Sequence, residues 1–342
     1  MSSHKFWADI VREVFPGAVV EDAALEYPIT DNGWRVNLPS PKDLPWHLTD
    51  FRLVLNLQDM LTTSRTDKFP IELHTIHDFY SGFDYVDMNK IIVLVWPMGL
   101  QKDWGISSND TFNLIEFSSH QYETWCAYKD AEDVLRDAFS REHKDFEYNF
   151  VCPQRIYKPH RGALHGSLDS SIGNISLQTK GIQLAYPSLT MQEYDDTYDN
   201  LLNLLCMKKN YNTSLFTIIS ESQYAEEYGI ITEKTWNAIV AGHPFLMCAH
   251  QFALVQLQGL GFHTYSNYFD ETYDELDNVL RMKDMINSNW RYTQERLSYT
   301  EMENLYNEMQ GVINYNRDYY FDQFGDQMIS ELRMDLLHLW GK

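Results

Sequence analysis

Short apolar runs alternate with amphipathic stretches through the second half of the chain. Runs rich in β-branched and aromatic residues predict strands at 146–155, 181–189, 214–222, 244–249 and 262–269. The stretches between them predict helices at 198–209, 232–242 and 252–261, with a further helix or turn starting at residue 162. Two of these helices end at a glycine, a frequent helix terminator. Strands that alternate with helices predict βαβ units and a parallel sheet.

The first half carries the same kind of signal. Three apolar runs predict strands at 51–60, 90–98 and 112–119, and residues 130–139 predict a helix. The charged stretch 140–148 then lies between this helix and the next strand, and we expect a domain boundary there.

The end of the chain, from about Ser298, is predicted to be helical. Its apolar residues recur at three- and four-residue steps and predict one packing face, formed by Met302, Leu305, Tyr306, Met309, Val312 and Ile313. We therefore expect an α/β protein with an N-terminal α/β domain at 1–145, a second α/β domain at 146–295 and C-terminal helices at 296–342. These helices can also cross back onto the first domain.

Composition and charge narrow the classes of function. A chain of 342 residues is long enough for two domains of roughly 100–200 residues each. Its formal charge of -22 repels nucleic acid and anionic membranes, so we expect no nucleic-acid partner and only a local pocket for any phosphate. No apolar run is long enough to span a bilayer, and the first residues do not resemble a signal peptide. The four cysteines are scattered, which is typical of reduced thiols, and we expect a cytoplasmic protein.

The usual signatures of cofactor and metal sites are missing. The sequence contains neither G-x-G-x-x-G nor G-x-x-x-x-G-K-[ST], which argues against NAD-binding and P-loop classes. It has no zinc-ligand spacing, no G-x-S-x-G elbow, and no D-x-D pair of the kind that holds a divalent cation in many sugar-nucleotide enzymes. We therefore predict no metal site and no cofactor.

Basic residues stand at the end of the first strand of the second domain. Arg155, Lys158 and Arg161 crowd the loop that follows this strand, in a chain with few cations. A solvated loop and a binding site are both open interpretations for Arg155 and Lys158. For Arg161 we favour function, because a guanidinium at a helix start and the helix amides can share one phosphate.

A second candidate site lies in residues 220–234. Ser220 and Glu221 end a predicted strand, and Thr232 is a candidate N-cap that is followed by Glu233 and Lys234. Glu233 complements the helix dipole, but a lysine in the first helical turn is locally unfavourable. This placement of Lys234 predicts an anion bound at the same point.

Two other residues of this region have structural interpretations. We interpret His243 as a residue of the turn between the helix and the next strand. Trp236, on the same helix, is predicted to be a core residue.

These stretches resemble the α-1,3-fucosyltransferase family and related bacterial and phage glycosyltransferases. The resemblance covers roughly residues 146–280 and is carried by the T-E-K at 232–234, the A-G turn that follows it, and the arginine that opens a helix after "FVCPQRIYKPH". Tyr228 corresponds to the family's tyrosine at a displaced position, and Ser222 stands where the family has asparagine.

The resemblance implies a GT-B fold, which consists of two Rossmann-like domains facing a cleft with the nucleotide-sugar on the second. It implies that Arg161 and Lys234 hold the diphosphate, that Glu233 binds the ribose, and that Glu221 lies near the donor sugar. The first domain would then be the acceptor side. The implied partners are a nucleotide-sugar donor and a glycan acceptor, with no membrane span.

The resulting hypothesis is a metal-independent, inverting glycosyltransferase, with GDP-fucose as the implied donor. Without D-x-D, cations and helix N-termini must stabilise the departing diphosphate. An inverting enzyme also needs a carboxylate base from the first domain, and Glu116 and Asp59 are the candidates because each lies near a predicted strand end. For either residue taken alone, a surface acid at a strand end is the favoured interpretation. The alternatives are a UDP-sugar or other donor, or a non-catalytic nucleotide-sugar or glycan-binding protein.

Overall fold

The computed structural model divides the chain into two compact units. Unit 1 comprises Met1–Glu123 together with Gly325–Lys342, and unit 2 comprises Thr124–Phe324. The structure describes residues 6–22, 24–26, 35–37, 40–45, 51–56, 83–84, 86–95, 113–117, 119–154, 157–176, 178–179, 182–183, 200–222, 224, 229 and 231–340. Both units are mixed α/β with parallel sheets, which agrees with the predicted α/β class.

Unit 1 is built on a four-stranded parallel sheet. Its strands are β1 (Gly17–Asp22), β4 (Phe51–Asn56), β5 (Ile91–Val95) and β6 (Asn113–Glu116), in the order β1-β4-β5-β6. The middle strands carry continuous apolar runs, and residues 53–55 and 91–94 are fully buried. Such runs are typical of parallel strands that are covered on both faces. The three strands predicted in the first half of the chain are confirmed as β4, β5 and β6.

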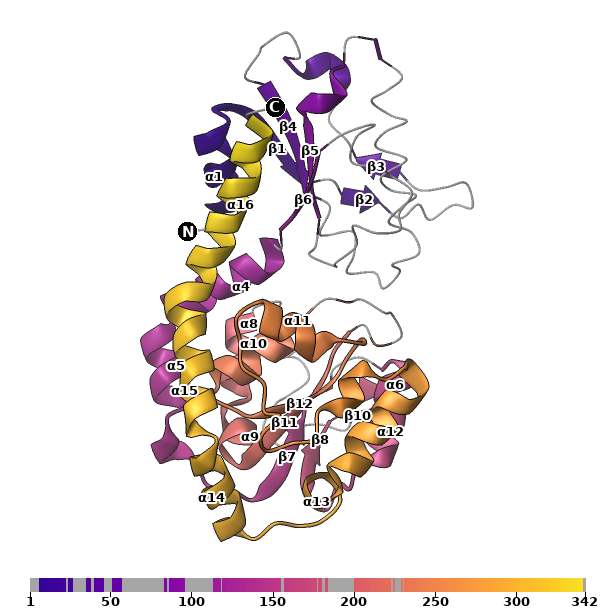
Figure 1. Ribbon diagram of the computed structural model, residues 1–342, viewed down its shortest axis with the longest axis vertical. Coiled ribbons are helices and arrows are strands. Elements are labelled where there is room, and N and C mark those ends of the chain that lie inside the picture. The colour runs from indigo at the N-terminus through magenta and orange to yellow at the C-terminus, as the bar shows by residue number, and fades with distance from the viewer. Residues whose placement is uncertain are drawn as a thin grey trace. The chain divides into compact units, whose positions relative to one another are not determined.

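The ends of the chain meet in unit 1. Helix α1 (Phe6–Val14) packs against α16 (Gly325–Trp340), and the two lie side by side in Figure 1. An ion pair between Arg333 and Glu13, at 2.8 Å, joins the two helices. The remaining described elements of unit 1 are the short antiparallel pair β2 (Ala24–Glu26) and β3 (Arg35–Asn37) and the 3₁₀ turns η1 (Pro41–Asp43) and η3 (Met88–Lys90).

Unit 2 contains a second four-stranded parallel sheet. Its strands are β7 (Tyr148–Cys152), β8 (Gly173–Ile175), β11 (Ser214–Ser220) and β12 (Phe245–Cys248), in the order β12-β11-β7-β8. Every residue of β11 and β12 is buried. A two-stranded antiparallel ribbon, formed by β9 (Gln178–Thr179) and β10 (Ile182–Gln183), follows β8 along the chain.

Helices separate the strands of unit 2 along the chain. Helix α4 (Ser119–Asp130) carries the chain into the unit, and α6 (Pro159–Ser167) and α10 (Glu233–Val240) follow β7 and β11. The other helical segments are α5 (Glu132–Ala138), η4 (Arg141–His143), α8 (Asn200–Cys206), α9 (Lys208–Asn212), α11 (Ala253–Gly259), η5 (Thr272–Glu275), α12 (Asn278–Ser288), α13 (Trp290–Thr293), α14 (Tyr299–Glu308), α15 (Gln310–Tyr319) and the π-helical η6 (Tyr320–Phe324).

The predicted glycine stop of α10 is confirmed. Gly242 has a φ of 57°, and the N–H groups of Gly242 and His243 donate to the carbonyls of Ile239 and Ala238. This pair of bonds is a Schellman motif, which requires the left-handed conformation that glycine adopts without strain. The helix therefore ends abruptly, and the chain turns directly into β12.

The strand predicted at residues 262–269 is wrong. The structure has turns there, and side chains satisfy backbone groups that a strand would pair with a neighbour. Asn316 accepts from the N–H of His263 and donates to its carbonyl, and Glu271 accepts from the N–H of Tyr265. The aromatic residues that suggested a strand are instead packed into the core, where Phe262 contacts the ring of Trp236.

The observed division of the chain differs from the predicted boundaries at 145/146 and 295/296. Unit 2 begins inside α4, so α4 and α5 lie with the sheet that follows them. The C-terminal helices are shared between the units, because α14 and α15 belong to unit 2 and α16 belongs to unit 1. The chain thus crosses back to the first unit, at the point where η6 meets Gly325.

No helix in the described part of the chain combines the length and the apolar character that crossing a bilayer requires.

Lys144 is a buried cation beside the C-terminal helices of unit 2. Its Nζ donates to the carbonyl of Tyr211 at 3.2 Å and lies 5.5 Å from the ring centroid of Tyr306. Burial, together with the nearby charges of Arg317 and Arg141, lowers the pKa of Lys144 to about 7. In the unfolded chain a lysine keeps its proton up to its ordinary pKa of 10.5.

Stability is therefore expected to rise with pH above neutrality. Between about pH 7 and 10.5 the unfolded chain holds a proton on Lys144 that the folded chain has released, so the free energy of unfolding increases with pH. A full proton corresponds to about 1.4 kcal/mol per pH unit. In urea denaturation from pH 7 to about pH 8.5, the free energy of unfolding of Lys144→Met should rise less steeply with pH than that of the parent. At pH 7 the variant should be more stable than the parent. The exposed Lys209→Met should keep the parental slope; an equal slope in Lys144→Met would contradict this account.

Candidate functional site

The strand order of unit 2 creates a switch point between β7 and β11. From β7 the chain passes through α6 to β8 on one side, and it later returns to place β11 on the other side of β7. In open α/β sheets, ligands bind outside the carboxyl ends of the strands at such a point. Here the helices that follow the two strands, α6 and α10, both begin at this edge of the sheet.

Helix α6 begins with an unusual concentration of cationic and polar groups. Lys158 is its N-cap residue, Pro159 occupies the first turn, and His160 and Arg161 follow. These side chains contact the carbonyl oxygens of three successive residues, 220–222, at the end of β11. Arg161 Nη2 donates to the first at 3.2 Å, His160 Nε2 lies 3.1 Å from the second, and Lys158 Nζ donates to the third at 2.7 Å.

Glu221 is the buried anion of the site. Its carboxylate is completely inaccessible to solvent and accepts from the N–H and hydroxyl of Thr232 and from the hydroxyl of Thr235 at 2.8 Å. From the end of β11, it therefore accepts from the backbone N–H of the N-cap residue, as the N3 carboxylate of a capping box normally does. Thr232 stands at the N-cap position, as predicted, but its hydroxyl donates to Glu221 and makes no capping bond to the helix.

Lys234 meets anions that belong to the protein. Its Nζ donates to Glu233 Oε1 at 3.0 Å and to Thr232 Oγ1 at 2.9 Å, and it lies 3.8 Å from Glu221 Oε2. Its side chain is 16% exposed, so the lysine is not fully enclosed by the protein. The unfavourable position of this cation at a helix start is thus offset within the fold by two carboxylates.

The pKa of His160 is affected by the cations around it. Burial, together with the positive charges of Arg161, Lys158 and Lys234, lowers the pKa of His160 to about 4. The imidazole is therefore neutral near pH 7. Arg161 is only 3% exposed, and its pKa is also lowered by burial, while Glu221 and Glu233 act in the opposite direction.

Tyr224 and Arg281 complete the surroundings, and the sequence analysis missed both. The ring of Tyr224 stacks on His160 with centroids 5.1 Å apart, and the Arg281 guanidinium lies 5.3 Å from the same ring. Arg281 donates to the carbonyls of Tyr224 and Ala249, which fixes positions after β11 and after β12. The sequence shows only that an arginine stands at position 281, because its burial and its partners, 57 and 32 residues away, depend on the fold.

The structure brings together most of the predicted binding residues of unit 2. Described around the switch point are Lys158, Arg161, Ser220, Glu221, Thr232, Glu233 and Lys234. Tyr228 and Arg155 lie outside the described residues, as does the candidate base Asp59 of unit 1. Glu116 is the last residue of β6, and its backbone alone is described.

His243 and Trp236 have structural roles, as predicted. His243 is fully buried, with Nδ1 2.7 Å from Thr217 Oγ1 and Nε2 close to the carbonyls of Tyr211 and Ser214. Trp236 is 1% exposed and packs against the rings of Phe262 and Phe324. Both therefore hold α10 and β12 in place behind the site.

The chemistry that these groups offer is the binding of an anion. Two helix N-termini and three cations converge where backbone N–H groups and partial positive charge already favour negative ligands. Within the described residues, no three His, Cys, Asp or Glu side chains gather as metal ligands would.

Comparison with known proteins gives no family for this chain. No protein-family model matches it, and searches of curated proteins and of solved structures find no similar protein.

Replacing Glu221 should loosen the start of α10. Glu221→Gln keeps the shape but removes the charge beside Lys234 and points amide hydrogens at donors that need an acceptor. We expect a loss of roughly 1–3 kcal/mol in the free energy of unfolding, measured by urea denaturation. Glu308→Gln, on an exposed residue of α14, should change stability by less than about 0.5 kcal/mol. Equal stability of both variants would show that the Glu221 contacts contribute nothing.

Proposed function

We propose that this chain is a glycosyltransferase that moves a sugar from a nucleotide-sugar to a glycan acceptor, with inversion and without a metal ion. The observation that carries the proposal is the convergence of Lys158, Arg161 and Lys234 on the β7–β11 switch point. An acidic chain that gathers cations at one sheet edge has a local site for a diphosphate. The motif resemblance to α-1,3-fucosyltransferases supports the same assignment, with GDP-fucose as the donor and a GT-B fold.

In this proposal the role of each cation depends on how far its side chain is exposed to solvent. Lys234 and Lys158 contact the diphosphate, because both side chains are only partly buried. Arg161, which is held by the carbonyl of Ser220, contributes a fixed buried charge at the start of α6. Negative charge grows on the diphosphate as the glycosidic bond to the donor breaks, so preorganised cations lower the barrier.

The carboxylates also take separate roles. Glu233, 30% exposed at the start of α10, binds the ribose hydroxyls of the donor. Glu221 is saturated by Thr232 and Thr235, so it positions α10 and does not touch the sugar. The reaction also needs a general base that removes the proton of the acceptor hydroxyl, and Glu116 and Asp59 stay the candidates.

Removing the Lys234 ammonium should weaken nucleotide binding. A charge-assisted hydrogen bond contributes on the order of 1.5–3 kcal/mol, so Lys234→Ala should bind GDP or UDP at least about tenfold more weakly in isothermal titration. Lys209→Ala, a matched exposed lysine of α9, should bind as the parent does. If folded Lys234→Ala binds both diphosphates as tightly as the parent, or if the parent binds neither, the proposal fails. Binding without sugar transfer would identify a nucleotide-sugar-binding protein.

Sugar transfer should persist in EDTA. The sequence lacks D-x-D, and the cations of the switch point supply the charge that a metal provides elsewhere. Turnover of GDP-fucose, or of whichever nucleotide-sugar the titration selects, is measured before and after chelation. Loss of activity that Mn²⁺ or Mg²⁺ restores would refute the metal-independent mechanism while leaving the transferase assignment intact.

A further inference from the structure

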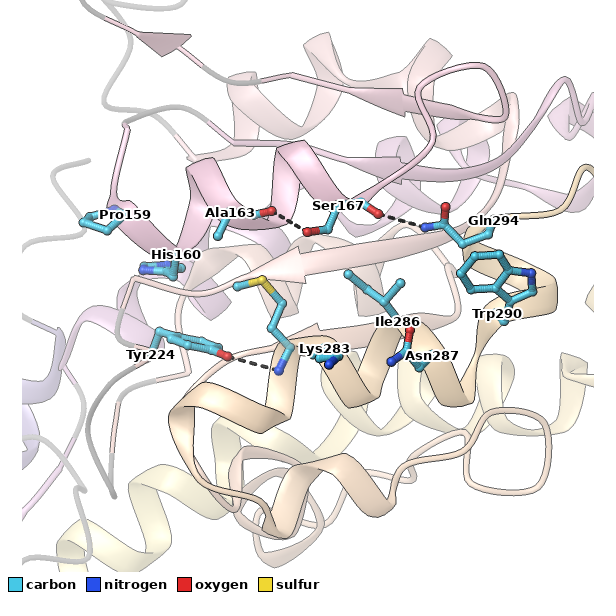
Figure 2. Close-up of a pocket in the computed structure, with 11 residues that line it drawn as sticks. Pro159, His160, Ala163, Ser167, Tyr224, Lys283, Ile286, Asn287, Trp290 and Gln294 are labelled. Atoms are coloured by element: carbon cyan, nitrogen blue, oxygen red, sulfur yellow. Dashed lines mark hydrogen bonds between the residues drawn. The ribbon is translucent and has the colours of Figure 1, made fainter.

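A groove of about 870 Å³ runs between α6 and α12. Figure 2 shows His160 and Tyr224 at one end of this α6–α12 groove and Trp290 and Gln294 at the other. The volume is within the range of roughly 300–1,000 Å³ that is typical of small-molecule sites. Because His160 lies between Lys158 and Arg161, the groove starts directly beside the cation site.

Small side chains on α6 leave the groove open. Ala163 and Ser167, one helical turn apart, face the residues of α12 across it (Figure 2). Gln294 Nε2 donates to the carbonyl of Ser167 at 2.9 Å and joins the two walls at the far end. At the near end, the stacked rings of His160 and Tyr224 are held by the bond from the N–H of Met282 to the Tyr224 hydroxyl. Both ends of the groove are therefore fixed.

The charge of the groove is opposite to that of the chain. The sequence has 49 acidic and 27 basic residues, yet none of the described residues that line the groove is acidic, and Lys283 is among them. His160 contributes a neutral imidazole, which has one donor and one acceptor. This balance favours a neutral or anionic ligand over a cationic one.

The remaining lining groups combine flat rings with short hydrogen-bonding side chains. Trp290 leaves 52% of its surface exposed at the far end of the groove, so its indole ring is accessible to a ligand. Between Trp290 and His160 stand the carboxamide of Asn287, the hydroxyl of Ser167 and the ammonium of Lys283. A pyranose matches this pattern, because its C–H face packs on an aromatic ring while its hydroxyls at the rim take donors and acceptors.

We propose that the α6–α12 groove binds a short neutral or anionic saccharide. This rests on the proposed function, in which the saccharide is the part of the glycan acceptor remote from the reacting hydroxyl. Trp290 supplies the stacking surface, and Asn287 and Lys283 select hydroxyl and carboxylate groups. Because the groove opens at His160, its occupant reaches the cation site from the side of α6.

The test uses the full chain and three saccharide probes: maltotriose, chitotriose and a hyaluronan tetrasaccharide, which carries uronates. Saturation-transfer NMR first detects binding, with indole-3-acetate as a planar aromatic competitor of a different class, and titration then measures affinity. We expect at least one saccharide to bind with a Kd below about 10 mM, and Trp290→Ala to weaken it about tenfold or more. Leu280→Ala, on an equally exposed residue of α12 at 51%, should bind as the parent does.

Three outcomes would overturn the saccharide site: no signal from any of the three probes, undiminished binding in Trp290→Ala, or groove-dependent binding of indole-3-acetate alone. Parallel titration with GDP and UDP separates this proposal from the previous one. Nucleotide binding that depends on Lys234, without saccharide binding, sinks only the groove assignment. Saccharide binding that depends on Trp290, without nucleotide binding, keeps the saccharide site and removes its acceptor role.

Discussion

The buried carboxylate of Glu221 is the interaction on which the arrangement of the switch point depends. Cations at the start of a helix are normally disfavoured, yet α6 and α10 both carry them there. Glu221 faces the N-terminus of α10 directly, and its own carbonyl, with those of Ser220 and Ser222, accepts from the α6 side chains. One three-residue segment thus offsets the positive ends of two helices.

This arrangement fixes the cations in place, but it requires that the carboxylate of Glu221 be buried. An ionised carboxylate with no solvent contact is stable only when several donors reach it, and Thr232 and Thr235 provide them. The aromatic cluster around Trp236 supports α10 from behind, so the helix cannot shift to relieve the charges. The cations are thus held in fixed positions by the fold, and such preorganisation favours the recognition of an anion.

Local patterns in the sequence were sufficient to predict the elements that flank this segment. The run of β-branched and aromatic residues in β11 predicts a strand and the glycine after α10 predicts a helix end, and the structure agrees with both. The aromatic run at 262–269 was ambiguous, because its pattern fits a strand as well as a packed turn, and bonds to the distant Asn316 decided the matter. The inward orientation of Glu221 was equally hidden, since sequence shows that an acid ends a strand but not which helix start faces it.

Unit 1 is assembled from two separated stretches of chain, and this has a consequence for its biosynthesis. A ribosome releases the N-terminal strands first, then all of unit 2, and only then the helix α16 that packs on α1. Helix α1 therefore lacks this partner throughout translation of about three hundred intervening residues. Unit 2 is contiguous and can fold as it emerges, whereas unit 1 is completed only when α16 has been synthesised.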